Sequence, residues 1–154
     1  MIVRRLTLVC LLVGVGGLPS GARGQASDSL ARTADSTSKA LSTVARRVTT
    51  AFTQGNASRL LSPSADRVEI SLFGARTFYS SAQALYVLRE FFRAHVPQRF
   101  RVRDVTDTGR SYFVRGTYDQ ANRTRRLQVY VRLGQPEGHD LWHLHEVRID
   151  GPSE

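Results

Sequence analysis

The 154-residue sequence is nearly without cysteine, because its one cysteine, Cys10, lies within the apolar run Leu6–Val15 near the N-terminus. The rest of the chain holds no thiol, which excludes a disulfide framework, a cysteine nucleophile and a thiolate metal site there. Lysine is also scarce: Lys39 is the only one, and the other basic residues are arginines. Because arginine pairs well with phosphates and carboxylates, this bias reflects either codon usage in a GC-rich genome or selection for anion binding.

Long apolar runs are missing as well. Leu6–Val15 is too short to span a bilayer comfortably. It follows Arg4 and Arg5 and is followed by glycine, proline and alanine residues, an order typical of a secretory signal peptide. We therefore expect residues 1–26 to be a signal peptide, with cleavage after Ala22 as the alternative, and the mature protein to be exported to the periplasm or secreted.

Removal of this segment would change both charge and chemistry. The net charge falls from +9 to +6, because Arg4, Arg5 and Arg23 are lost. The mature chain is therefore still basic. Cys10 lies inside the apolar run rather than at its end, so we expect no lipidation and no stable membrane anchor. An exported domain of this size does not need disulfides.

Several nucleotide-binding and hydrolase motifs are also absent. The sequence has no P-loop, no dinucleotide-binding glycine motif and no nucleophile elbow. We therefore expect no cofactor.

Hydrophobic periodicity gives the order of elements. Residues 27–38 are polar and predict a flexible leader, and residues 39–150 form one domain. Helical spacing predicts helices, and alternation predicts strands. A bulge near His145–Glu146 would bring the apolar residues of the last strand to one face. The expected helices are 39–54, 57–62 and 79–95, and the expected strands are 66–73, 76–79, 99–107, 111–120, 124–133 and 141–150.

The helix at 79–95 is the centre of this plan. Ser80 or Ser81 can cap its start, and Pro97 ends it. Its apolar stripe is too wide for a lone surface helix, so a sheet or a second helix must cover it. Helices on one face of an antiparallel sheet make an α+β fold.

The chain resembles the nuclear transport factor 2-like superfamily, and within it small exported bacterial proteins described only as a domain of unknown function. The resemblance covers about residues 40–150 and implies a cone in which a curved antiparallel sheet wraps around helices. The fold itself implies no activity, because relatives include enzymes, carriers and adaptors. The residues that carry the resemblance are Gln54–Ala57, Leu60–Leu61, Val68–Ile70, Tyr79–Ala84, Val87–Leu88, Phe91–Phe92 and Glu146–Asp150.

No carboxylate stands out as a catalytic acid or base. A buried acid flanked by apolar residues would suit proton transfer. Glu69 faces away from its apolar neighbours, Asp119 lies at a strand end, and Asp104 shares the parity of Phe100 and Val102. Asp104 is therefore the one candidate for an inward acid, against the simpler interpretation of a solvated carboxylate. We assign no catalytic residue and expect a protein that is not an enzyme.

His143 and His145 form an H-x-H pair close to His139, Asp140 and Glu146. Two histidines at alternate strand positions can chelate one metal ion. No third ligand is fixed by spacing, and the expected bulge would separate the pair. We therefore favour exposed polar residues and assign no metal site.

Two surfaces remain as candidate sites. On the strands, the positions that alternate with the apolar ones are rich in arginine and aromatic residues. Such a face can form a protein interface, as in a homodimer, or bind an anionic polymer, or it can simply be exposed to solvent. We expect no nucleic acid partner for an exported protein. The cone interior is the alternative, as a ligand pocket or as a closed core. The sheet-face candidates are Arg101, Arg103, Phe113, Arg115, Tyr130 and Arg132, and the pocket candidates are Phe92, Tyr112, Tyr118 and Trp142.

The sequence thus predicts a non-catalytic binding or assembly module that acts through its sheet face. The alternative is a small-molecule carrier or an isomerase-like enzyme that uses the cone cavity.

Overall fold

A computed structural model describes the backbone of residues 24–138 and 141–152, and side chains from residue 35 onward. Residues 1–34 and residues 35–154 form two compact units. Most of the expected signal peptide lies outside the described residues. None of the described helices is both long and apolar enough to cross a bilayer.

The first helix, α1, covers Gly24–Gln54 and so begins well before the Lys39 that the sequence predicted. The expected flexible leader, 27–38, is helical here, and its lack of glycine and proline is compatible with a helix. In the second unit, α1 buries the apolar stripe that the spacing predicted. Its fully buried members are Val44, Val48, Ala51 and Phe52.

A second, short helix follows a tight turn. Gly55 has φ +60°, the left-handed conformation expected at a helix end, and Asn56 caps α2 (Ala57–Leu61) by accepting a hydrogen bond from the Arg59 backbone. This agrees with the predicted helix at 57–62.

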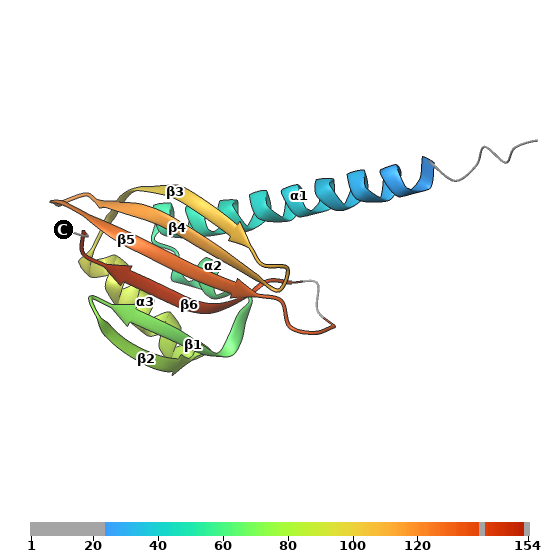
Figure 1. The fold of residues 1–154 in the computed structure, drawn as a ribbon. Coiled ribbons are helices and arrows are strands. Elements are labelled where there is room, and N and C mark those ends of the chain that lie inside the picture. The colour runs from blue at the N-terminus through green and yellow to red at the C-terminus, as the bar shows by residue number, and fades with distance from the viewer. Residues whose placement is uncertain (1–23, 139–140, 153–154) are drawn as a thin grey trace, which may run out of the picture. The chain divides into compact units, whose positions relative to one another are not determined.

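Six strands form one curved, unclosed sheet (Figure 1). The strand order is β2-β1-β6-β5-β4-β3, so the first strand pairs with the last. That β1–β6 ladder is parallel, whereas the other four are antiparallel, and the expectation of a wholly antiparallel sheet is wrong at this one place. The strands are β1 (Ser64–Leu72), β2 (Ala75–Ser80), β3 (Pro97–Asp107), β4 (Ser111–Gln120), β5 (Arg123–Gly134) and β6 (His143–Asp150).

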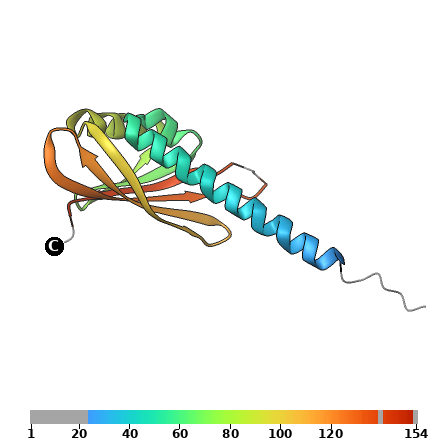
Figure 2. The same cartoon turned by 90° about the horizontal axis from the view of Figure 1, so that it is seen from above.

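The central helix, α3 (Ser81–Ala94), has the predicted start. Ser80 is its N-cap, and Gln83 completes a capping box by accepting a hydrogen bond from the Ser80 backbone. Figure 2 shows α2 and α3 on the same side of the sheet. The buried side of α3 consists of Ala84, Leu88, Phe91 and Phe92.

Aromatic rings fill the space between these helices and the sheet. Phe52 of α1 stacks on Phe100 of β3 with ring centroids 4.9 Å apart, and meets Phe92 of α3 edge-on at 5.5 Å. Phe100 lies directly over Gly116, where a Cβ atom would lie only 2.8 Å from the carbonyl oxygen of Arg101. The glycine is therefore needed for this close approach of β3 to β4.

The predicted bulge in the last strand is confirmed. The register of β5 and β6 shifts where Arg132 faces Glu146 and Leu133 faces Leu144, which leaves His145 as the extra residue. Leu144, Val147 and Ile149 are consequently all buried.

Arg47 ties the first helix to two distant loops. Its guanidinium donates hydrogen bonds to the carbonyl oxygens of Leu60 (2.8 Å), Pro63 (2.7 Å) and Trp142 (2.5 Å). Burial lowers the pKa of Arg47 to about 10, so the side chain is still charged at neutral pH. It supplies the donors for the end of α2 and for the chain just before β6, which periodicity in the sequence does not reveal.

We predict that Arg47→Met lowers the free energy of unfolding by about 2–4 kcal/mol, because it leaves several partly buried carbonyl groups without donors. Arg46→Met is the matched control, since Arg46 is the exposed neighbour on the same helix. Denaturant unfolding of both variants measures the difference. Equal stability of the two variants would contradict this role for Arg47.

Candidate functional site

Among the described residues, the helices cover one face of the sheet, and no element covers the other. We call the second surface the open face and define it by strand alternation and burial. Its residues are Arg67, Glu69 and Ser71 of β1, Glu146, Arg148 and Asp150 of β6, Gln128, Tyr130 and Arg132 of β5, Phe113, Arg115 and Thr117 of β4, and Arg101 and Asp104 of β3.

Two buried carboxylates lie at the centre of the open face. Glu69 and Glu146 are each only 5% exposed, and they face each other across the β1–β6 ladder. Glu69 pairs with Arg76 of β2. Glu146 pairs with Arg132 at 3.3 Å and with Arg148 at 3.0 Å. Each acid is therefore neutralised by arginine, as burial of a carboxylate requires.

Sequence alternation misjudged these two residues. Glu69 does face away from Val68 and Ile70, as alternation indicates, but it is buried all the same, so the second half of β1 is buried on both faces. Long arginine side chains cover the acids. The burial of the two glutamates becomes evident from the pairing of β1 with β6, which places them side by side.

Aromatic and arginine side chains lie next to these acids. The rings of Phe113 and Tyr130 are 6.0 Å apart, and the guanidinium of Arg148 lies over the Tyr130 ring at 5.4 Å. Arg115 faces Tyr130 across the β4–β5 ladder, and Arg132 faces Phe113. The structure thus brings four of the six predicted sheet-face residues together.

The other two predicted residues belong to β3. Arg101 faces Thr117 of β4 and lies 3.6 Å from the carboxylate of Asp119. Arg103 is the extra residue of a bulge, because the register shifts between Val102 and Asp104. Arg103 is exposed at the edge of the open face.

That bulge also decides the position of Asp104. The extra residue moves its side chain from the predicted inward parity to the open face, where Arg115 donates to it at 2.8 Å. The hydrogen bond from Arg115 holds the pKa of Asp104 below its usual value. Asp104 as an inward acid is therefore wrong, and the carboxylate is an ionised partner of Arg115.

A shallow hollow of about 430 Å³ runs across β3, β4, β5 and β6 on the open face. It carries three arginines and two aspartates around Tyr130, so it presents both signs of charge. Its lining residues include Arg103, Asp104, Arg115, Gln128, Tyr130, Arg148 and Asp150.

The four pocket candidates form two contacts in the interior. Phe92 and Tyr118 pack together with ring centroids 6.4 Å apart, and Tyr112 packs on Trp142 at 4.0 Å. The Tyr118 hydroxyl donates to the carbonyl oxygen of His95, and burial raises the pKa of Tyr118 well above its usual range. Their role as a ligand pocket stays a prediction, and this packing supports the alternative of a closed core.

The H-x-H pair lies at the bulge of β6. His145 packs against Gly134, where a side chain would collide with the imidazole ring. Burial, together with Arg132 and His143, lowers the pKa of His145, so its ring is neutral at pH 7. Within residues 35–138 and 141–152, no three potential ligands are grouped to hold a metal ion. His139 and Asp140 lie outside the described residues.

We predict that Glu146→Gln lowers the free energy of unfolding by about 2–4 kcal/mol, because it leaves Arg132 and Arg148 without their shared buried counterion. Glu137→Gln is the control, since Glu137 pairs with Arg110 on the exposed surface and such pairs contribute little. Thermal or denaturant unfolding compares the two. A Glu146→Gln variant as stable as the control would mean that the buried pairs do not hold the open face.

The comparisons with solved structures show the same fold. The crystal structure of a DUF4783 family protein from Bacteroides ovatus matches with a TM-score of 0.64 and 27% identity, over 70% of this chain and 94% of that chain. One from Bacteroides uniformis matches with a TM-score of 0.64 and 25% identity, over 71% and 97%.

A more distant structure supports the fold alone. A nuclear transport factor 2-like protein of unknown function from Silicibacter pomeroyi matches with a TM-score of 0.54 and 15% identity, over 77% of this chain and 98% of that chain. The protein therefore has the nuclear transport factor 2-like α+β fold that its sequence predicted. No curated protein shows significant sequence similarity to it. The sequence profile of a domain of unknown function, DUF4783, matches residues 45–150, and the chain belongs to that family.

Proposed function

We propose that this protein is an exported, non-catalytic binding or assembly module that acts through the open face of its sheet. The observation that carries the proposal is the hollow across β3–β6, which holds three arginines and two aspartates around Tyr130. The export signal predicted within residues 1–26 supports the cellular setting.

The charge pattern of the open face suits association between two copies. In a two-fold dimer the same patch meets itself, so it must be complementary to its own rotated image. A patch with only one sign of charge would repel its copy. The hollow instead offers Arg103, Arg115 and Arg148 beside Asp104 and Asp150, so each copy can provide both partners of an ion pair.

Aromatic groups supply the apolar part of such an interface. Phe113 and Tyr130 are half-buried and lie side by side, so each keeps an accessible ring surface. Tyrosine and arginine are the residues enriched at the centres of protein interfaces. Burying these rings against a second copy would add apolar contact to the ion pairs.

The pairing of four carboxylates of the sheet argues against catalysis by these groups. A general acid or base needs a carboxyl group that is free to exchange a proton with substrate. Glu69, Glu146 and Asp104 are each bound to arginine, and Asp119 is bound by Arg126. These carboxylates therefore serve to hold arginines in place.

The double variant Arg103→Glu with Arg115→Glu tests the proposal. We expect it to weaken self-association by roughly tenfold or more, because it turns the rim of the hollow acidic and each change counts twice in a symmetric dimer. Light scattering and sedimentation over a range of protein concentrations measure the effect.

The matched control is Arg46→Glu with Arg89→Glu. It makes the same charge change at exposed positions of α1 and α3. An unchanged mass in the test variant, with unchanged recovery of any bound partner, would count against the open face. An equal loss in both variants would point to net charge instead.

A further inference from the structure

A second charged surface lies at the end of the sheet formed by the β4–β5 hairpin and the start of β3. It is defined by five arginines and one carboxylate, and we call it the hairpin end. Its charged residues are Arg99, Arg101, Asp119, Arg123, Arg125 and Arg126.

The single carboxylate is already engaged. Asp119 accepts a hydrogen bond from Arg126 Nε at 2.6 Å and lies 3.6 Å from Arg101. The bond from Arg126, with Arg101 and Arg99 nearby, holds the pKa of Asp119 below its usual value, so it stays ionised at neutral pH. One negative charge is thus shared among several guanidinium groups.

The remaining three arginines take part in no ion pair among the described side chains, although Arg99 lies near enough to Asp119 to help lower its pKa. Arg99, Arg123 and Arg125 are exposed. The hairpin end therefore carries a concentrated positive charge, unlike the open-face hollow, where three arginines lie with two aspartates. A patch of this kind repels its own copy and attracts anions.

The hairpin is held in place by a buried amide. Gln120 is 3% exposed, and its Nε2 donates to the carbonyl oxygen of Arg125 at 2.9 Å. Its Oε1 lies 2.6 Å from Nδ1 of His95 at the end of α3. The Ala121 amide also donates to the carbonyl oxygen of Val96 at 2.9 Å. The arginines therefore project from a fixed hairpin, which lowers the cost of ordering them on binding.

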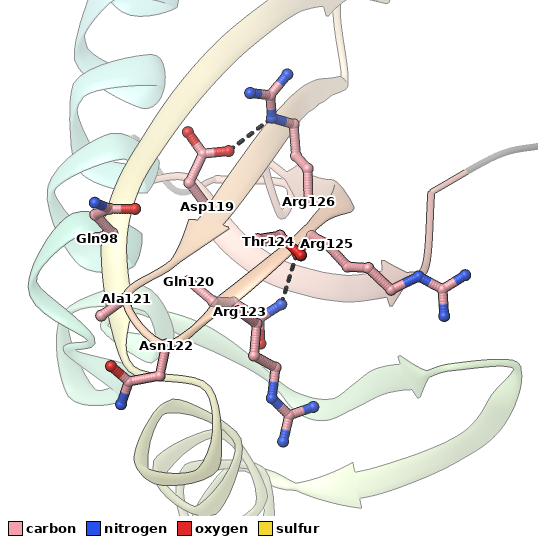
Figure 3. Close-up of a pocket in the computed structure, with 9 residues that line it drawn as sticks. All are labelled: Gln98, Asp119, Gln120, Ala121, Asn122, Arg123, Thr124, Arg125 and Arg126. Atoms are coloured by element: carbon pink, nitrogen blue, oxygen red, sulfur yellow. Dashed lines mark hydrogen bonds and ion pairs between the residues drawn. The ribbon is translucent and has the colours of Figure 1, made fainter.

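Figure 3 shows how the side chains are arranged around a hollow of about 430 Å³ between Gln98 and the hairpin. Arg123, Arg125 and Arg126 extend in different directions from β5. They do not converge on one point, as a site for a single small anion would require. They can instead contact successive groups of a chain that passes over the hairpin.

We propose that the hairpin end binds an extended polyanion that carries repeated phosphate or carboxylate groups. Arginine matches both groups, because its planar guanidinium donates two parallel hydrogen bonds to either. The repeated charge explains why several diverging arginines share one surface. The ligand class differs from that of the open face, and the two surfaces as defined here share only Arg101, so this binding can be present whether or not the protein self-associates.

The test measures binding of the full-length protein to two probes, inorganic polyphosphate and alginate, which supply phosphate and carboxylate separately. We expect binding to at least one of them at near-physiological salt, with affinity that falls steeply as salt rises because counterions are released. The test variant is Arg123→Glu with Arg125→Glu, which we expect to lose roughly tenfold or more in affinity.

Arg46→Glu with Arg89→Glu again serves as the control, since it makes the same charge change away from the hairpin. The proposal holds if the test variant loses far more affinity than this control. It is overturned if both lose the same, which would show an effect of net charge only, or if the wild type binds neither probe. Binding to anionic phosphatidylglycerol vesicles without binding to either polymer would also overturn it.

Discussion

One face of the sheet is buried against helices. In the described part of the chain, the other face is stabilised by contacts among its own side chains. Burial of unpaired carboxylates in the middle of that second face would cost several kcal/mol each. Arg76 neutralises Glu69, and Arg132 and Arg148 neutralise Glu146, so the strands can bring the two acids side by side. This arrangement also bears on the aromatic part of the open face, because Arg148, which pairs with Glu146, lies over the Tyr130 ring.

The two charged surfaces differ in a way that separates their roles. The open-face hollow holds arginines together with aspartates, and we propose that it pairs with its own copy. The hairpin end has five arginines against Asp119, which makes it complementary only to something anionic. The two surfaces lie on one sheet, so a protein that assembles through the first would present several copies of the second. Multiple copies raise the avidity for a polymeric ligand.

Much of the fold could be predicted from the sequence, because period and turn chemistry are local. The capped helix at Ser80, the left-handed Gly55 and the bulge beside His145 all follow from neighbouring residues. The parallel β1–β6 ladder could not be predicted, since the residues near either strand do not show which strand it pairs with. For the same reason, the local sequence did not predict that Glu69 and Glu146 are buried or that Arg47 binds three distant carbonyl groups.

The candidate site was partly predictable for the same reason. Strand parity placed Phe113, Arg115, Tyr130 and Arg132 on one surface, and the ladders bring them together. Parity failed for Asp104, because the bulge at Arg103 changes the register and no local signal marks that bulge. Arg123, Arg125 and Arg126 are visible in the sequence, but the structure is needed to show that Asp119 meets Arg126 and Arg101, while Arg123 and Arg125 form no ion pair among the described side chains.

Hydroxyl-radical footprinting of the wild-type protein tests the central claim, that the open face is a contact surface. Tyr130 and Phe113 report on this face, and Tyr86, which is 67% exposed on α3, is the internal reference. The account predicts that oxidation of Tyr130 and Phe113 falls as protein concentration rises, while Tyr86 reacts as before. Oxidation of all three that is independent of concentration and of any bound partner would contradict it.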